Sequence, residues 1–250
     1  MSFGLHSLLA MGLYFAAHAF RCVRLYILSL GSRRGGARLV AAHCLTAWPS
    51  AVIPFKAGEL LRLAGFSAAV RSPLDGVAIW FIERLSDALA LTALIIALSF
   101  MFPMSRQAMI ILYLTSGFIV ACAFGAWLTF EVLPFLRNDL LLRSRSRKGL
   151  VLLRFLHRVQ VTLAAAQRLL IGRFSATLLA GFVIWGCEFA AIALFAIGAG
   201  ASERSALNAN FFAGDVHAIE QRLPVFVALS VIGVVILGTI IVRRWPRHES

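Results

Sequence analysis

Charged residues interrupt the apolar stretches of this sequence, and one place combines bases and an acid within a few positions. It holds Pro54, Lys56, Gly58, Glu59 and Arg62. Pro54 ends whatever segment precedes it, and Gly58 permits a close or strained backbone. Glu59 and Arg62 then share one face of a new helix. The pattern is either the start of an interfacial helix whose acid complements the helix dipole, or a turn that presents charges to a ligand.

A second group of charges, Glu83, Arg84 and Asp87, lies well inside the apolar stretch 74–102. Glu83 and Asp87 share a helix face, and Arg84 falls three residues before Asp87. A charge inside hydrocarbon costs roughly 2.5–3.5 kcal/mol, so the three side chains cannot all face lipid. Either they compensate one another and lock helices together, or they line a hydrophilic groove.

Two further sites carry isolated charges. His18, Arg21 and Arg24 lie near the end of the first apolar stretch. Snorkelling to the headgroups explains Arg24 easily and Arg21 less well. Glu188 lies near the middle of a later apolar stretch and is a functional candidate. Pairing with Arg21 or Arg84 would instead make Glu188 purely structural.

The elements that hold these residues are predicted to be membrane helices. Hydrophobic residues make up 60% of the 250, charged residues 14%, and mean hydropathy is +0.87, which excludes an ordinary soluble domain. A bilayer-crossing helix needs about 20 apolar residues. Five stretches qualify, at residues 5–30, 74–102, 109–135, 174–198 and 224–242. Segment 39–55, broken by Pro49 and Pro54, is predicted to re-enter rather than cross. We expect an all-α, multi-pass membrane protein with one domain over residues 1–250.

The positions of the basic residues indicate that the net charge of +13 reflects membrane topology and not nucleic-acid binding. Basic residues gather between and beside the apolar stretches, at 32–38, 56–71, 137–173 and 243–247. The positive-inside rule then predicts an outside N-terminus and a cytoplasmic C-terminus. Leucines and arginines alternate in 137–173, which either reflects the positive-inside bias alone or predicts one or two amphipathic helices on the cytoplasmic face.

Sequence motifs for common chemistries are absent. There is no phosphate-binding Gly-rich loop ending in Lys-Ser or Lys-Thr, no dinucleotide pattern, no His-Glu-x-x-His and no Gly-x-Ser-x-Gly. The four cysteines lack metal-type spacing. We therefore expect no catalytic residue, metal or cofactor. A membrane glycosyltransferase remains an alternative; its carboxylates would be Asp215 and Glu220, in an outside loop that is short for this purpose.

The stretch Ile53-Pro54-Phe55-Lys56-Ala57-Gly58-Glu59-Leu60-Leu61-Arg62, followed by Ile82-Glu83-Arg84-Leu85-Ser86-Asp87, resembles the membrane region of lysylphosphatidylglycerol synthases. The same region occurs in stand-alone flippase-like proteins, also called the uncharacterised family 0104. The resemblance runs from about residue 13 to 98, and Arg21 or Arg24 fits the arginine that closes the preceding span. Ser50 stands where the family usually has Asn. The family's late Pro-Gly-Gly-rich segment and its aminoacyltransferase domain have no counterpart, so a short or divergent member is expected.

The resemblance implies binding or translocation of a phospholipid or polyprenyl-phosphate-type lipid in a bacterial-type inner membrane, for envelope biogenesis. Lys56, Arg62 and Arg84 would contact the phosphate. Glu59, Glu83 and Asp87 would hold these cations and contact a cationic or hydroxylated head. The expected binding residues are thus Lys56, Glu59, Arg62, Glu83, Arg84, Asp87, Arg21 and Glu188, shaped by Pro54 and Gly58. A non-catalytic subunit that assembles with a partner protein of an envelope pathway is the other alternative.

Overall fold

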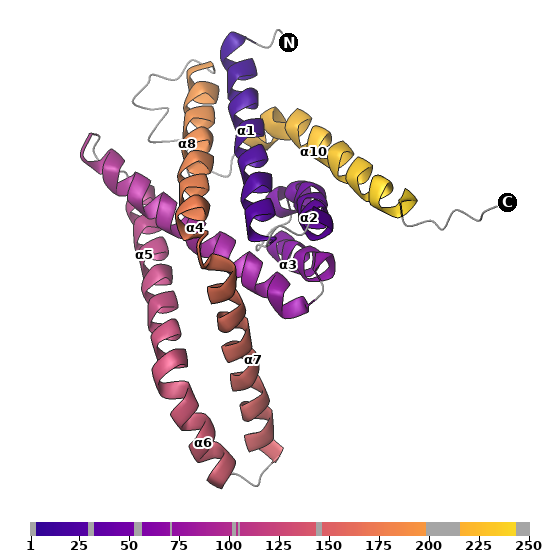
Figure 1. Cartoon of the computed structure of the whole chain (residues 1–250). Coiled ribbons are helices and arrows are strands. Elements are labelled where there is room, and N and C mark those ends of the chain that lie inside the picture. The colour runs from indigo at the N-terminus through magenta and orange to yellow at the C-terminus, as the bar shows by residue number, and fades with distance from the viewer. Residues whose placement is uncertain are drawn as a thin grey trace, which may run out of the picture.

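The chain folds into helices throughout the part that the computed structural model describes, which is residues 4–29, 33–52, 57–70, 72–101, 104, 106–143, 147–198 and 216–243 (Figure 1). The helices are α1 (Leu5–Leu28), α2 (Arg33–Val52), α3 (Ala57–Ala69), α4 (Pro73–Ser99), α5 (Arg106–Trp127), α6 (Leu133–Arg143), α7 (Arg147–Leu170), α8 (Phe174–Gly198) and α10 (Val216–Val242). A π-helical turn, η2 (Leu128–Val132), joins α5 to α6. The all-α prediction is confirmed for these residues.

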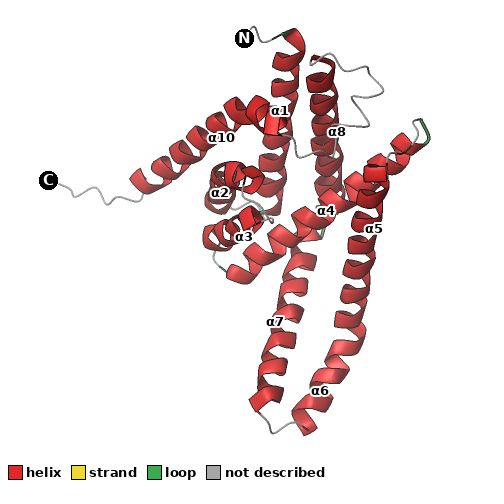
Figure 2. Cartoon of the chain, turned by 180° about the vertical axis from the view of Figure 1, so that it is seen from behind, coloured by secondary structure: helices red, strands yellow, loops and turns green. Residues whose placement is uncertain are grey.

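Helices α1 and α8 stand side by side and form the centre of the molecule (Figures 1 and 2). Small side chains allow the close approach: Ala10, Ala17 and Ala191 are completely buried. Ala10 and Ala191 belong to a core cluster that also takes in Phe226 and Leu229 of α10. The small residues matter because they leave room on the same buried face of α1 for larger polar side chains.

Helices α2 and α3 form an antiparallel hairpin below α1. A Cβ atom on Gly58 would meet the Cα of Ser50 at 2.3 Å, and one on Gly65 would meet the Cβ of Ala42 at 3.5 Å, so α3 runs back along α2. The Ser50 hydroxyl also donates a hydrogen bond to the Gly58 carbonyl oxygen over 3.1 Å. Glycine is required at position 58 because backbone atoms of α2 occupy the place of a side chain.

The predicted break in segment 39–55 is wrong at Pro49. Helix α2 starts at Arg33 and continues for 20 residues, with Pro49 inside its last turns. A proline removes one backbone hydrogen bond, and this loss is tolerated where neighbouring helices pack around the turn. Pro54 and Lys56 lie outside the described residues. The predicted change of direction is present, since the chain reverses between α2 and α3.

Helix α4 runs diagonally past the ends of α1 and α8 and lies along α3, with Gly76 against Ser67 and Glu83 against Arg62 (Figure 1). Pro73 occupies its first turn, where the missing N–H group costs nothing. Ile79 and Ile82 of α4 pack with Leu25 of α1 and Phe66 of α3 in one buried core cluster. This packing turns the middle of α4, with its charged residues, towards α1 and α3.

The remaining helices form a long hairpin that extends away from α1 and α8 (Figure 2). Helices α5 and α6 continue one rod, and Pro134 lacks the N–H that the preceding turn would need, which accounts for the π-helical turn at η2. Helix α7 returns along this rod and meets α8 at a turn where Gly172 has a φ of 70°. Since α7 and α8 run nearly end to end, their combined length of roughly 70 Å exceeds a ~30 Å hydrocarbon core. The two helices therefore cannot both stand upright in one bilayer.

Five helical segments among the described residues are long and apolar enough to cross a membrane, as five were expected. They are Leu5–Leu28, Arg106–Asp139, Lys148–Leu170, Phe174–Phe195 and Arg222–Ile241. Four match predicted spans, whereas α4 is absent from the set because of its internal charges. The segment in α7 takes its place, although the sequence predicted a surface amphipathic helix there. By length and composition alone, α7 could cross a membrane. It lies end to end with α8, however, and not beside the pair formed by α1 and α8.

Candidate functional site

Four polar side chains follow the buried face of α1 at intervals of three or four residues. They are Tyr14, His18, Arg21 and Arg24, with 6%, 5%, 8% and 0% of their surface exposed. At roughly 1.5 Å per residue, they extend about 15 Å along the helix axis. We call these four residues the polar column. Buried polar groups need partners, and the column takes its partners from α2, α4, α8 and α10.

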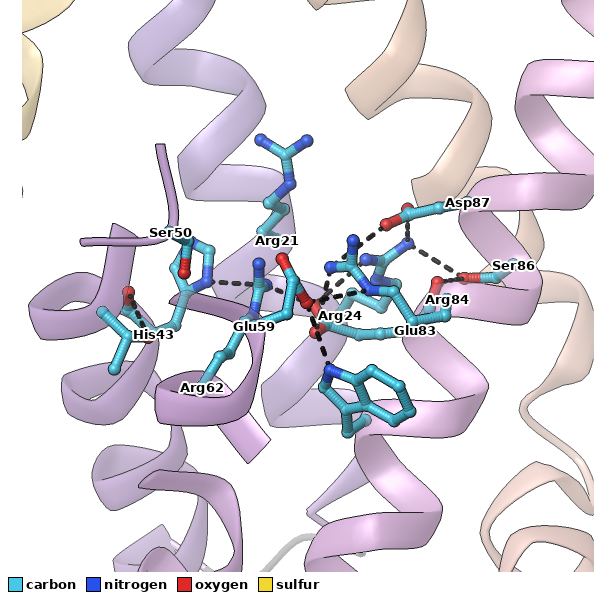
Figure 3. Close-up of polar contacts among 12 residues, drawn as sticks. Arg21, Arg24, His43, Ser50, Glu59, Arg62, Glu83, Arg84, Ser86 and Asp87 are labelled. Atoms are coloured by element: carbon cyan, nitrogen blue, oxygen red, sulfur yellow. Dashed lines mark hydrogen bonds and ion pairs between the residues drawn. The ribbon is translucent and has the colours of Figure 1, made fainter. Parts of the chain in front are cut away.

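Arg24 lies at the centre of the site and joins α1 to α4 (Figure 3). Its Nη1 donates to Asp87 Oδ1 over 2.7 Å and to Ser86 Oγ over 2.9 Å, and its Nη2 donates to Glu83 Oε1 over 3.1 Å. Glu83 is completely buried, like Arg24. The sequence assigned Arg24 to snorkelling, and this interpretation is wrong because the side chain points inward to two carboxylates.

Arg62 connects the same carboxylate to α2. Its Nη2 donates to Glu83 Oε1 over 2.9 Å and lies 2.9 Å from Nδ1 of His43. Its guanidinium also lies 5.5 Å from the ring centre of Phe66, one turn further along α3. Arg62 is 6% exposed, so α3 contributes a buried cation to the site.

The contact with Arg62 fixes the proton positions of two histidines. A guanidinium only donates, so His43 Nδ1 accepts, and the hydrogen of a neutral His43 ring is on Nε2. That Nε2–H donates to Nδ1 of His18 over 3.2 Å, which places the His18 hydrogen on its own Nε2. The Nε2 atom of His18 is buried and has no hydrogen-bond partner among the described residues. The directed chain from Arg62 through His43 therefore ends in an unused donor.

Glu59 and Arg84 form a more open rim beside the buried charges, with side chains 23% and 28% exposed. Trp80 Nε1 donates to Glu59 Oε2 over 3.1 Å. Arg84 lies 3.7 Å from Glu59, 3.8 Å from Glu83 and 3.5 Å from Asp87. These distances are ion pairs that are too long for good hydrogen bonds. Among the described residues, Arg84 is thus held by charge without a good hydrogen bond, and its Nε is buried and lacks a partner.

Glu188 of α8 pairs with Arg21 over 2.6 Å, and both side chains are largely buried, at 14% and 10% exposure. Of the two explanations considered from the sequence, the structural pairing with Arg21 is the one found. The pair links α1 to α8 next to the Arg24 contacts. A buried carboxylate on an apolar helix is thereby neutralised.

Charges in the central region balance. The cations are Arg24, Arg62 and Arg84, and the anions are Glu59, Glu83 and Asp87. We call Arg24, Arg62, Glu83 and Asp87 the central cluster. Removing one partner of such a buried pair costs about 3–5 kcal/mol, because the other charge is left unpaired. The central cluster therefore locks α1, α3 and α4 together, and Glu59 and Arg84 of the rim are its more exposed neighbours.

The predicted site residues divide into three groups. Those brought together around the central cluster are Glu59, Arg62, Glu83, Arg84 and Asp87. Arg21 and Glu188 pair with each other beside it, and Gly58 shapes the α2–α3 hairpin. Lys56, Pro54 and Asp215 lie outside the described residues, as does the side chain of Glu220.

Sequence reasoning missed several residues of the site, among them Tyr14, Trp80, His43 and Arg222. His43 was overlooked because a single histidine in a small-residue segment carries no pattern of its own. Arg222 lies 4.7 Å from the Tyr14 ring centre, in a region assigned to an outside loop. Its spacing of four from Phe226, which packs on the same Tyr14 ring, was the available signal for a helix face.

An apolar cavity of about 520 Å³ lies on the other side of α4, between α4, α5 and α7. Phe81, Leu85 and Leu89 of α4 line it, and Gln167 of α7 is the polar side chain in its wall. At 100° per residue, Leu85 faces away from Glu83 and Asp87. Helix α4 thus presents charges to one side and an apolar slot to the other.

Metal-binding groups of three or more His, Cys, Asp or Glu side chains do not occur among the described residues. Cys22, Cys44, Cys122 and Cys187 are free thiols. The chemistry available in the described site is thus that of arginine, carboxylate and imidazole groups.

Comparison with known proteins adds no assignment to this geometry: the chain matches no protein-family model, no curated protein and no solved structure. The resemblance drawn from residues 53–62 and 82–87 stays a prediction.

Proposed function

We propose that this chain is a multi-pass membrane protein that binds a lipid with a phosphate-bearing head and lets the head move between the membrane faces. The observation that carries the proposal is Arg84, a cation on the rim that is held by ion pairs of 3.5–3.8 Å and makes no good hydrogen bond to a described residue. An arginine fork suits the oxygens of a phosphate. The central cluster behind it holds the rim in place.

The polar column supports a path for a polar head. Ionisable residues inside apolar helices are expensive, and they commonly mark substrate pathways in membrane proteins. Here they continue along α1 for ten residues, from Tyr14 to Arg24, instead of forming one isolated pair. A head that leaves the rim would therefore meet further polar groups rather than hydrocarbon.

The apolar cavity supports a lipid over a small soluble anion. Its volume of about 520 Å³ lies within the roughly 300–1,000 Å³ of typical ligand sites. Its wall is almost wholly apolar and includes Leu85, which directly follows Arg84. A hydrocarbon chain in the cavity and a phosphate at Arg84 would place the two parts of one lipid on neighbouring faces of α4.

The arrangement of helix ends agrees with an outside N-terminus in an inner membrane. The start of α1, the start of α5 and the C-terminal end of α8 lie towards one end of the molecule, and the end of α6 and the start of α7 lie at the other (Figure 1). The second end carries the basic residues Arg137, Arg147 and Lys148. This distribution follows the positive-inside rule, with the basic end in the cytoplasm.

Reconstitution tests the proposal. Liposomes with fluorescent phosphatidylglycerol or polyprenyl phosphate receive an impermeant quencher, and the exposure of inner-leaflet probe is followed over time. The wild type is expected to accelerate exposure, Arg84→Ala to lose most of the acceleration, and Arg84→Lys to recover part of it by restoring the charge. Arg154→Ala, on an exposed face of α7, is the matched control and is expected to behave as wild type.

Two results contradict the proposal. One is the absence of acceleration by folded wild-type protein with either lipid, which favours a non-catalytic subunit and makes partner identification the next step. The other is acceleration that is the same in Arg84→Ala as in the wild type. Folding of each variant is checked by its elution volume and its helical circular dichroism before transport is compared.

A further inference from the structure

The end of the polar column away from the central cluster has donors without acceptors. The Nε2–H of His18 is buried, and no described residue accepts its hydrogen bond. Arg222 of α10 lies with its Cζ 4.7 Å from the ring centre of Tyr14, and its buried Nε is likewise without a partner among the described residues. Neither group takes part in the contacts of the central cluster.

The two donors are close to each other. The His18 ring centre lies 4.8 Å from the Tyr14 ring centre, and the Arg222 Cζ lies 4.7 Å from the same point. The His18 ring centre and the Arg222 Cζ are therefore at most about 10 Å apart, and one phosphate group with a hydrogen bond at each end bridges donor nitrogens roughly 8 Å apart, which lies within this limit. Phe226, one turn after Arg222, contacts both rings at 5.9 Å and 6.1 Å and closes the apolar side.

Among the described side chains, the charge at this end of the polar column is not balanced. Arg21, the nearest cation on α1, is already neutralised by Glu188 at 2.6 Å. Arg222 is partly buried, and it has no carboxylate partner among the described side chains. Arg222 hydrogen-bonds the Tyr14 side chain, but its Nε and the Nε2–H of His18 lack acceptors among the described residues, and an anion would supply them.

We propose that Tyr14, His18 and Arg222 form a second site, which binds a phosphate group between α1 and α10. Two kinds of donor from two helices suit a tetrahedral oxyanion, which offers more acceptor directions than a planar carboxylate. The phosphate belongs to a lipid head or to free phosphate, since the same donors serve both. This inference goes beyond the proposed function, because it requires no movement of lipid across the membrane.

Titration of the purified chain in an uncharged detergent tests the site. The probes are inorganic phosphate, dioctanoyl-phosphatidic acid and, as a neutral lipid control, dioctanoylglycerol. The protein is labelled with ¹⁵N-histidine, and the Nε2–H signal of His18 is identified by its loss in His18→Gln. Binding is expected to shift this signal. Arg222→Gln is expected to weaken the affinity at least tenfold, and Arg243→Gln, an exposed arginine at the other end of α10, to leave it unchanged.

The outcomes separate the sources and the alternatives. A shift with phosphatidic acid alone assigns a lipid head, and equal shifts with inorganic phosphate assign a free anion; both support the site. Absence of a shift with both phosphate probes, or equal affinity in wild type and Arg222→Gln, overturns it. The His18 signal reports on this site and the liposome assay reports on lipid translocation, so that failure of the lipid-translocation proposal and failure of this site are distinguished.

Discussion

Arg24 and Asp87 make the shortest contact of the central cluster, 2.7 Å between Nη1 and Oδ1, although 62 residues separate them in the chain and neither is more than 7% exposed in its side chain. The contact joins the end of α1 to the middle of α4. Replacing only one of the two residues should therefore destabilise the folded chain far more than replacing both.

Arg24→Met is expected to destabilise the folded chain by about 3–5 kcal/mol, because Glu83 and Asp87 lose their shared cation. The double substitution Arg24→Met/Asp87→Leu should recover a substantial part, since Glu83 still pairs with Arg62 over 2.9 Å. Unfolding in mixed detergent micelles, followed by circular dichroism, measures both variants. Equal losses in the single and double variants would contradict a coupled pair.

Gly58→Ala is expected to destabilise the chain by about 1–3 kcal/mol, since the added Cβ would meet backbone atoms of Ser50 and Pro49 at 2.3 Å and 2.6 Å. Gly65→Ala is the control on the same helix. Its Cβ would make ordinary contacts of 3.5 Å and 3.6 Å, so the variant should be neutral or gain up to about 1 kcal/mol of helix propensity. The same unfolding measurement compares the two, and a greater loss at Gly65 would exclude the hairpin packing described for α2 and α3.

Reversal of the Arg21–Glu188 pair tests whether its role is charge compensation. Arg21→Glu and Glu188→Arg each place like charges together in a buried position, and each should lower the unfolding temperature strongly. The swapped double variant Arg21→Glu/Glu188→Arg should be more stable than either single variant. A double-mutant cycle gives the coupling energy, and a value near zero would mean that the 2.6 Å contact contributes no coupling.

Gly172→Ala should destabilise the join between α7 and α8 by about 1–2 kcal/mol, because φ is 70° there and a Cβ disfavours this conformation. Gly172→Asn should lose less, as asparagine tolerates the left-handed region better. Gly186→Ala, inside α8 with open space around the added atom, is the matched control for a Gly-to-Ala change. Limited proteolysis at the join supplies a local readout, and identical cleavage in all three variants would contradict the prediction.

The sequence was sufficient for the helices whose apolar character is uninterrupted. Helix α8 and the apolar part of α10 were predicted almost to the residue, because long apolar runs admit only a helix in a membrane. Helix α2 was predicted too short, since Arg33, Arg34 and Pro49 were taken as ends of an element. These residues are compatible with a helix when α3 packs along it, and that packing is not visible in local pattern.

The acidic residues of the site could be predicted from the sequence, but the basic residues that pair with them could be predicted less well. Glu83 and Asp87 were identified because charges inside an apolar run need compensation. The choice between Arg21 and Arg24 as their partner depends on how α1 faces α4, which the packing of Leu25 and Ile82 decides. Sequence spacing places both arginines on similar faces of α1.

The hydrogen-bond chain from Arg62 through His43 to His18 has a consequence for proton leakage. Proton conduction along such a chain needs every member to accept a proton on one side and release one on the other. Imidazole rings can do so, but a guanidinium keeps its protons. Arg62 therefore interrupts the chain between His18 and Glu83, and polar groups line this stretch of α1 without forming a proton wire through these side chains.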